Sequence, residues 1–357
     1  KSRLRDNTSD DAKRFRRELN LLTDRPIIMT GHQAEFWHSG ILAKYLVADA
    51  ASVALSAHPA WLFVDQDRAD SVALRYPART ASALTVGTAT VRERNLPTTE
   101  GLLEHLTPRM QLLLSTLKRH ELSPSLARRI AQTLSDLVKP YTSLPHSTLF
   151  ATDLSQTSLF QKLVRKMSQD PADCISQYNA AAGRHPSAGI RPLITNDIQD
   201  RWELPLWHLP PNQPRRHVYA EDIPNIPIHE LAPKALFMTG LMRLGACDLF
   251  IHGTGGGGGT SDDSAHEGYD VITEEWFERW LGVPPGNVAP MALVTATRYL
   301  PISSEPTPTE EDVAHALWLA HHARHDPAIL HDKLAAAAKQ HLLDQLALLP
   351  RRSRARY

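Results

Sequence analysis

A short apolar run, a helical stretch and a second apolar run follow one another near the N-terminus, and this order most constrains the fold. Residues 26–30 read Pro-Ile-Ile-Met-Thr and residues 61–64 read Trp-Leu-Phe-Val. Between them, the stretch from Ser39 has its apolar residues at helical spacing, and serine is a favoured N-cap. Two strands joined through a helix pair in parallel. We therefore expect an α/β protein built on a parallel sheet.

The rest of the chain alternates between strand and helix patterns. Strands are predicted within residues 72–95 and at residues 204–209, 217–220 and 248–252. Helices are predicted over most of residues 99–185 and at residues 10–22, 236–244, 273–281 and 310–349, with Thr273 as one N-cap and a break at Pro327. A turn is expected at Gly31, directly after the first strand.

Composition excludes several classes of protein. Thirty-nine basic residues balance thirty-nine acidic ones, so the net positive field that attracts nucleic acid or an anionic membrane is missing. The two cysteines, Cys174 and Cys247, are too few for a disulfide framework. No apolar run reaches the length of a membrane span, and the first residues are charged rather than secretory in character. We expect a cytoplasmic protein that acts on a small molecule.

Three polar segments follow predicted strands, and in parallel α/β sheets the ligand crevice lies at the carboxyl ends of the strands. The segments are residues 30–33, 65–67 and 252–255. We expect them to converge on one hollow.

The first segment is the strongest candidate for a site. Gly31 permits close approach of a ligand, and His32 and Gln33 supply an imidazole and an amide. The alternative is a capping turn whose histidine only satisfies a carbonyl. His38 precedes a helix whose N-terminus can hold an anion, with Lys44 about one turn inside, although such a lysine is often only solvated.

The other two segments supply carboxylates, an imidazole and a phenol. Alternation along the strand would send Asp65 and Asp67 to one side, where they could orient a hydroxyl, a ribose or hydrated magnesium; Asp67 could instead cap a turn. The third segment offers two residues at its strand end and two beyond the following loop, namely His252, Gly253, Tyr269 and Asp270. The glycine run between them, residues 255–259, predicts a lid or an ordinary loop rather than a phosphate loop.

Metal chemistry is not expected, despite eighteen histidines. No His-Glu-x-x-His motif is present, and His321 and His325 share a helix face without an evident third ligand. The absence of Gly-x-Ser-x-Gly argues against a serine hydrolase of the α/β type.

These motifs together resemble the cysteine-adding enzyme family of bacillithiol biosynthesis. The resemblance lies in residues 26–70: Thr-Gly-His-Gln-Ala at 30–34, Gly-Ile-Leu at 40–42 with Lys44 following, and Asp-Gln-Asp at 65–67. That family has Gly-Gln-Gln-Ala and an Asp-His-Asp type motif at these places, so His32 and Gln66 depart from it. The resemblance implies a Rossmann-like core related to nucleotidyltransferases, with Gly31, His32, Gln33, Asp65 and Asp67 lining the pocket.

The expected organisation combines this core with added helices. Residues 1–98 would form the first part of the Rossmann-like core, 99–190 a helical layer or insertion, 191–305 the second part of the core, and 306–357 C-terminal helices and a basic tail. Those helices could be a remnant of the family's coiled coil and could join two copies as a homodimer.

The expected function is that of a ligase-like or transferase enzyme that joins a small amino-acid or thiol unit to a polar acceptor. His32 would be a general base or transition-state donor, Gln33 would orient the substrate, Asp65 and Asp67 would bind its amine or hydroxyls, and Lys44 would attract an anion. A nucleotide is the candidate cofactor. The alternatives are a non-catalytic nucleotide- or sugar-binding protein and a metal-dependent hydrolase.

Overall fold

The chain divides into two compact units, Lys1–Arg298 and Tyr299–Tyr357. The computed structural model describes residues 9–21, 24–66, 71–79, 84–92, 108–196, 201–211, 213–254, 258–261, 264–296, 309–323 and 325–349.

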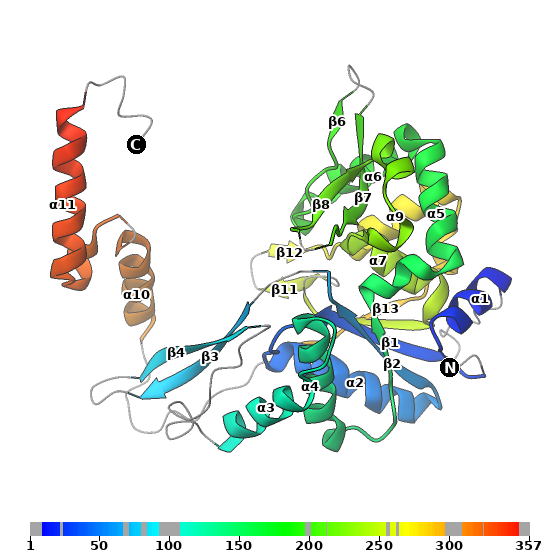
Figure 1. Cartoon of the computed structure of the whole chain (residues 1–357), viewed down its shortest axis with the longest axis horizontal. Coiled ribbons are helices and arrows are strands. Elements are labelled where there is room, and N and C mark those ends of the chain that lie inside the picture. Colours follow the sequence, from blue (N-terminus) through cyan, green and yellow to red (C-terminus); the bar gives the residue numbers. More distant parts are fainter. Residues whose placement is uncertain are drawn as a thin grey trace. The chain divides into compact units, whose positions relative to one another are not determined.

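A five-stranded parallel sheet forms the centre of the first unit. Its strands are β1 (Ile27–Gln33), β2 (His58–Val64), β5 (Ser147–Phe150), β10 (Leu249–His252) and β13 (Met291–Leu293). They lie in the order β13-β10-β1-β2-β5 (Figure 1). The chain thus moves outward from β1 to β2 and β5, then returns to the other side for β10 and β13. This is the doubly wound, Rossmann-like order, and its direction reverses between β1 and β10.

Helices cover both faces of this sheet (Figure 1). One face packs against α2 (Ser39–Leu55), α3 (Pro108–Arg119) and α4 (Leu126–Val138). The other packs against α1 (Asp10–Glu18), α5 (Ser158–Gln169), α6 (Pro171–Arg184), α7 (Ala235–Leu241) and α9 (Asp270–Leu281). Because both faces are buried, the central strands are apolar runs rather than alternating ones.

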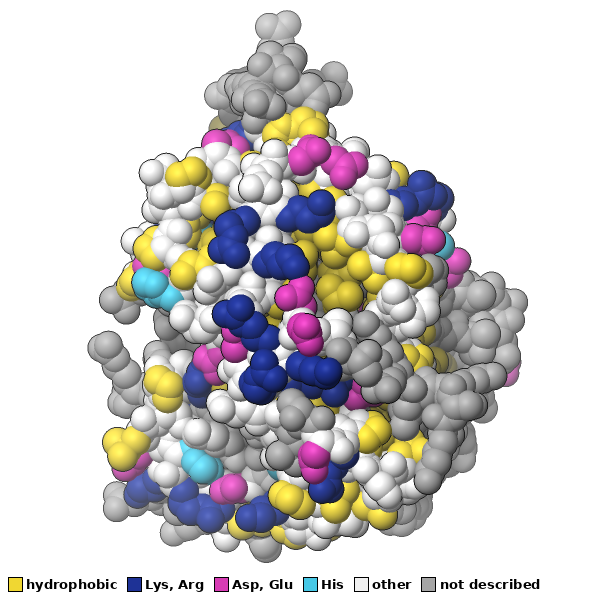
Figure 2. Space-filling view, turned by 90° about the vertical axis from the view of Figure 1, so that its right-hand side faces the viewer, with side chains coloured by type: hydrophobic (Ala, Val, Ile, Leu, Met, Phe, Trp, Pro, Cys, Tyr) yellow, Lys and Arg dark blue, Asp and Glu magenta, His cyan; other side chains and the backbone are white. Residues whose placement is uncertain are grey.

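The helices on the second face keep their charged sides in water. Phe15 of α1 and Phe160 of α5 are fully buried, whereas Lys13, Arg17 and Lys162 are exposed. Figure 2 shows the face on which α1 and α5 lie, where Lys and Arg side chains gather with Asp and Glu between them. Each of these helices therefore packs by one apolar stripe.

An antiparallel layer is added above the second face. It consists of β6 (Thr195–Asn196), β7 (Arg201–His208), β8 (Arg216–Tyr219) and β9 (Leu231–Pro233), with β8 and β9 both pairing with β7. Two separate hairpins pair β3 (Ser71–Arg79) with β4 (Leu84–Arg92), and β11 (Gly259–Ser261) with β12 (Ser264–His266).

The structure corrects three local expectations and adds one strand. Where they are described, residues 99–185 are mostly helical, as predicted, but β5 lies inside that range and pairs with β2. No turn occurs at Gly31, since β1 continues to Gln33; a Cβ at Gly31 would lie 2.9 Å from the Leu62 carbonyl oxygen, so glycine is needed for strand packing. The N-caps also differ. His38, not Ser39, caps α2, and α9 begins at Asp270, before Thr273.

The described part of the second unit, residues 309–323 and 325–349, contains two helices, as predicted. They are α10 (Glu310–Ala323) and α11 (Lys333–Leu348), separated by a 3₁₀ turn that begins at Pro327. Asp326 and Asp332 accept backbone hydrogen bonds at the starts of the turn and of α11. Within the described ranges, no helix of either unit is long and apolar enough to cross a membrane.

Candidate active site

A cavity of about 630 Å³ opens at the carboxyl ends of β1 and β10, where the strand order reverses. This is the place where doubly wound proteins bind ligands, and the volume suits a metabolite. Thr30 pairs with Ile251, so Gly31 and His252 are the next residues along the two neighbouring strands. Of the predicted site residues, the cavity is lined by Gly31, His32, Gln33, His38, Lys44, His252, Gly253 and Tyr269.

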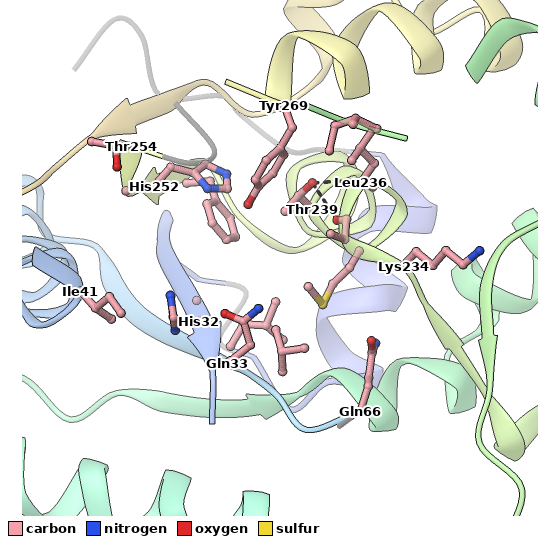
Figure 3. Close-up of a pocket in the computed structure, with 18 of the residues that line it drawn as sticks. His32, Gln33, Ile41, Gln66, Lys234, Leu236, Thr239, His252, Thr254 and Tyr269 are labelled. Carbon is pink, nitrogen blue, oxygen red and sulfur yellow. Dashed lines mark hydrogen bonds between the residues drawn. The ribbon is translucent and has the colours of Figure 1, made fainter. Parts of the chain in front are cut away.

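His32 and Gln33 reach the cavity from β1, opposite His252 and Tyr269 (Figure 3). Consecutive residues of a strand point to opposite faces, but the cavity lies beyond the strand end and receives both side chains. Burial, reinforced by the positive charge of Lys44, lowers the pKa of His32 to about 4. The imidazole is therefore neutral at pH 7, which suits a hydrogen-bond donor better than a general base.

Lys44 lies beneath β1 and is only 4% exposed. Its Nζ donates a hydrogen bond of 2.8 Å to the Gly31 carbonyl oxygen. Burial lowers the pKa of Lys44 to about 8, so it remains mostly charged at neutral pH. Nearby, the Nδ1 atom of His38 accepts a hydrogen bond from the Gly40 N–H, which fixes that ring at the start of α2. The predicted anion-attracting lysine is thus a buried lysine rather than a solvated one.

His252 is paired with a buried carboxylate. Its Nε2 atom lies 2.6 Å from Oδ2 of Asp270, although the angle departs from that of a good hydrogen bond. Arg243 Nη1 lies 3.5 Å from the other carboxylate oxygen. A carboxylate this close to a ring nitrogen offsets the positive charge of a protonated imidazole. Asp270 was expected to line the cavity but does not. It begins α9 inside the core and contacts His252 from behind.

Tyr269 completes this wall. Its ring meets the His252 ring edge-on, with centroids 5.7 Å apart, and Figure 3 shows its hydroxyl directed into the cavity. Burial, together with the neighbouring Asp270 charge, raises the pKa of Tyr269. The phenol therefore stays protonated and can donate a hydrogen bond to a ligand.

The prediction that Asp65 lines the pocket is wrong. Asp65 Oδ1 accepts from Thr152 N at 2.9 Å, and Oδ2 accepts from Thr152 Oγ1 at 2.6 Å and from Arg128 Nε at 3.2 Å. These partners hold the carboxylate beside β5, away from the cavity. Gln66 lines the cavity instead, and its Nε2 donates to the Pro233 carbonyl. Asp67 and the glycines at 255–257 lie outside the described residues.

Sequence reasoning missed one wall of the cavity, which comes from the antiparallel layer and the segments that adjoin its strands. This wall carries Arg191, Trp207, Arg215, His217 and Lys234. These residues are scattered over more than forty positions of sequence in short segments with no motif. The only hint is the basic run Arg215-Arg216-His217, which composition alone cannot place beside β1.

The described residues contain no group of three or more His, Cys, Asp or Glu side chains that could hold a metal. The rings of His321 and His325 are 6.1 Å apart at the end of α10, with no third ligand in that part of the chain. No family model matches this chain, and no curated protein matches it. Fold and cavity together define a doubly wound α/β protein with a pocket at its switch point.

Proposed function

We propose that this protein is a ligase-like or transferase enzyme that joins a small amino-acid or thiol unit to a polar acceptor. The proposal is carried by the pairing of His252 with the buried Asp270, beside the cavity at the switch point. Since Nε2 faces Asp270, the Nδ1 atom of His252 would take the proton from the attacking group. We place the reaction in the cytoplasm, where the buried thiols of Cys174 and Cys247 stay reduced.

In this reaction, a hydroxyl, amine or thiol loses its proton to His252 as its O, N or S atom forms the new bond. The bond from the attacked centre to its leaving group breaks, and the leaving group takes the electron pair and finally a proton. Neutral His32, the Gln33 amide and the Tyr269 hydroxyl lie around the same space (Figure 3). They can donate hydrogen bonds to negative charge that develops during the step.

The test is the formation of a new product. The full chain is incubated with mixtures of amino acids, thiols, sugars and nucleotides, and products are sought by mass spectrometry. In His252→Gln, the rate of product formation should fall by about 10²- to 10⁴-fold. The matched control is His208→Gln, because His208 is also paired with a carboxylate, Glu230 at 2.8 Å, but does not line the cavity.

The alternative is a non-catalytic module that binds a nucleotide or a sugar, and the cavity's size favours it equally. Calorimetry on the same mixtures separates the two. Heat of binding without any product would establish the module and refute the enzyme, whereas a product that His252→Gln makes at the normal rate would refute the role of His252.

A further inference from the structure

We propose that the cavity binds its substrate through a phosphate monoester, held by Arg191, Arg215 and Lys234 on the wall formed by the antiparallel layer. This inference rests on the proposed function insofar as it concerns the same cavity, and it names the class of substrate. Asp65 was expected to bind an amine or hydroxyls of the substrate, but its carboxylate accepts a hydrogen bond from Thr152 instead. Recognition of a phosphate replaces that expectation.

The charges that line the cavity are all of one sign. The described lining residues include the four cations Lys44, Arg191, Arg215 and Lys234, and no aspartate or glutamate. The whole chain, by contrast, has equal numbers of basic and acidic residues. A concentration of cations in one hollow of a neutral protein creates a local positive potential, which recruits an anionic ligand.

A buried glutamate organises three of the basic side chains on this wall. Glu203 has a fully buried side chain and lies 2.5 Å from Lys234 Nζ, 2.6 Å from His217 Nδ1 and 2.8 Å from Arg191 Nη2. It also accepts from the Ile194 N–H at 2.9 Å. Burial acts to raise the pKa of Glu203, but the hydrogen bonds from Lys234 and Ile194 outweigh it and the pKa is lowered. Glu203 is therefore a charged anchor that fixes where Lys234 and Arg191 lie.

An indole positions the third cation. The Arg215 guanidinium lies 4.4 Å and the Lys234 ammonium 4.8 Å from the centre of the Trp207 ring. Cation–π contacts hold both heads near the ring. The cluster thus presents two guanidinium groups and one ammonium group to the cavity. Guanidinium groups bind phosphate oxygens through paired hydrogen bonds, and a phosphate monoester near neutral pH carries up to two negative charges, whereas a single carboxylate carries one.

The remainder of the cavity fits such a ligand. Leu236 and Met238 line it together with the cationic wall, His252 and Gln33. With its phosphate held by the cations, the rest of the substrate would extend toward His252. Binding energy from this remote group would then orient the reacting atoms.

The experiment is calorimetry at pH 8 and low salt, with ribose 5-phosphate and inorganic phosphate as probes and with ribose and acetate as comparison compounds. Both phosphates should bind, and ribose and acetate should bind at least tenfold more weakly. Arg215→Gln and Arg191→Gln should each weaken ribose 5-phosphate binding at least tenfold. The matched control is Arg201→Gln, because Arg201 lies on β7 against Tyr219 and does not line the cavity, so its affinity should be unchanged.

Two results would overturn the proposal: no phosphate binding up to about 10 mM, or equal affinity in wild type, Arg215→Gln and Arg191→Gln. Thermal unfolding confirms that each variant is folded before it is titrated. Phosphate binding without any product would refute the proposed function and leave the phosphate site standing.

Discussion

His32 sets a dependence of stability on pH. It faces Lys44 and His38, and its Nδ1 lies 3.5 Å from Glu35 Oε1. The pKa of His32 is about 4 in the fold against 6.5 for an unperturbed histidine, so between these values only the unfolded chain binds the proton. Stability therefore falls as pH drops through this window, by ~2 to 3 kcal/mol for this group. Urea unfolding from pH 7 to pH 4 should show a smaller loss for His32→Gln than for wild type. Parallel curves would contradict the assignment.

Sequence could predict the residues that directly follow a buried strand. His32, Gln33 and His252 were found this way, because the end of a parallel strand is also the edge of the crevice. Asp65 also directly follows a buried strand, but it does not line the cavity. Its carboxylate accepts hydrogen bonds from Thr152 and Arg128, which come from distant segments of the chain. The place of Lys234 in the cavity could not be predicted from the sequence, because it depends on how the antiparallel layer packs on the central sheet.

A buried ion pair joins α1 to the central sheet. Asp248 precedes β10, accepts from the Ile27 N–H at 2.7 Å, and pairs with Arg16 of α1 at 2.9 Å. Both side chains are buried, so Asp248→Ala leaves an uncompensated cation and should lower the free energy of unfolding by ~3 to 5 kcal/mol. The exposed pair of Asp11 and Lys162 is the control: Asp11→Ala should cost less than ~1 kcal/mol. Equal losses in urea unfolding would contradict this account.

Elements with a clear period were predicted well, and short or constrained ones were not. The βαβ unit and the helices α10 and α11 follow from their patterns. The four residues of β5 are too few to show a period between neighbouring helices. At Gly31 the sequence suggested a turn, but the glycine serves the close approach of β2. Such a contact is invisible until the pairing of strands is known.

The two units of the chain have separate roles in this account. The described residues that line the cavity belong to the first unit. The helices of the second unit expose Leu317, Leu334 and Leu348, and we propose that they pair with a second copy of the chain. A chain ending at Arg298 should bind ribose 5-phosphate within twofold of the full chain and sediment with the mass of one chain, whereas the full chain should sediment with the mass of two. Loss of binding, or a full chain that is monomeric, would contradict these roles.

We propose that the substrate binds in the cavity at the switch point. A crystal structure of the full chain soaked with ribose 5-phosphate should show the phosphate beside Arg191 and Arg215 and the sugar directed toward His252. A ligand bound elsewhere, such as in the apolar hollow lined by Trp37 and Leu134, would contradict it.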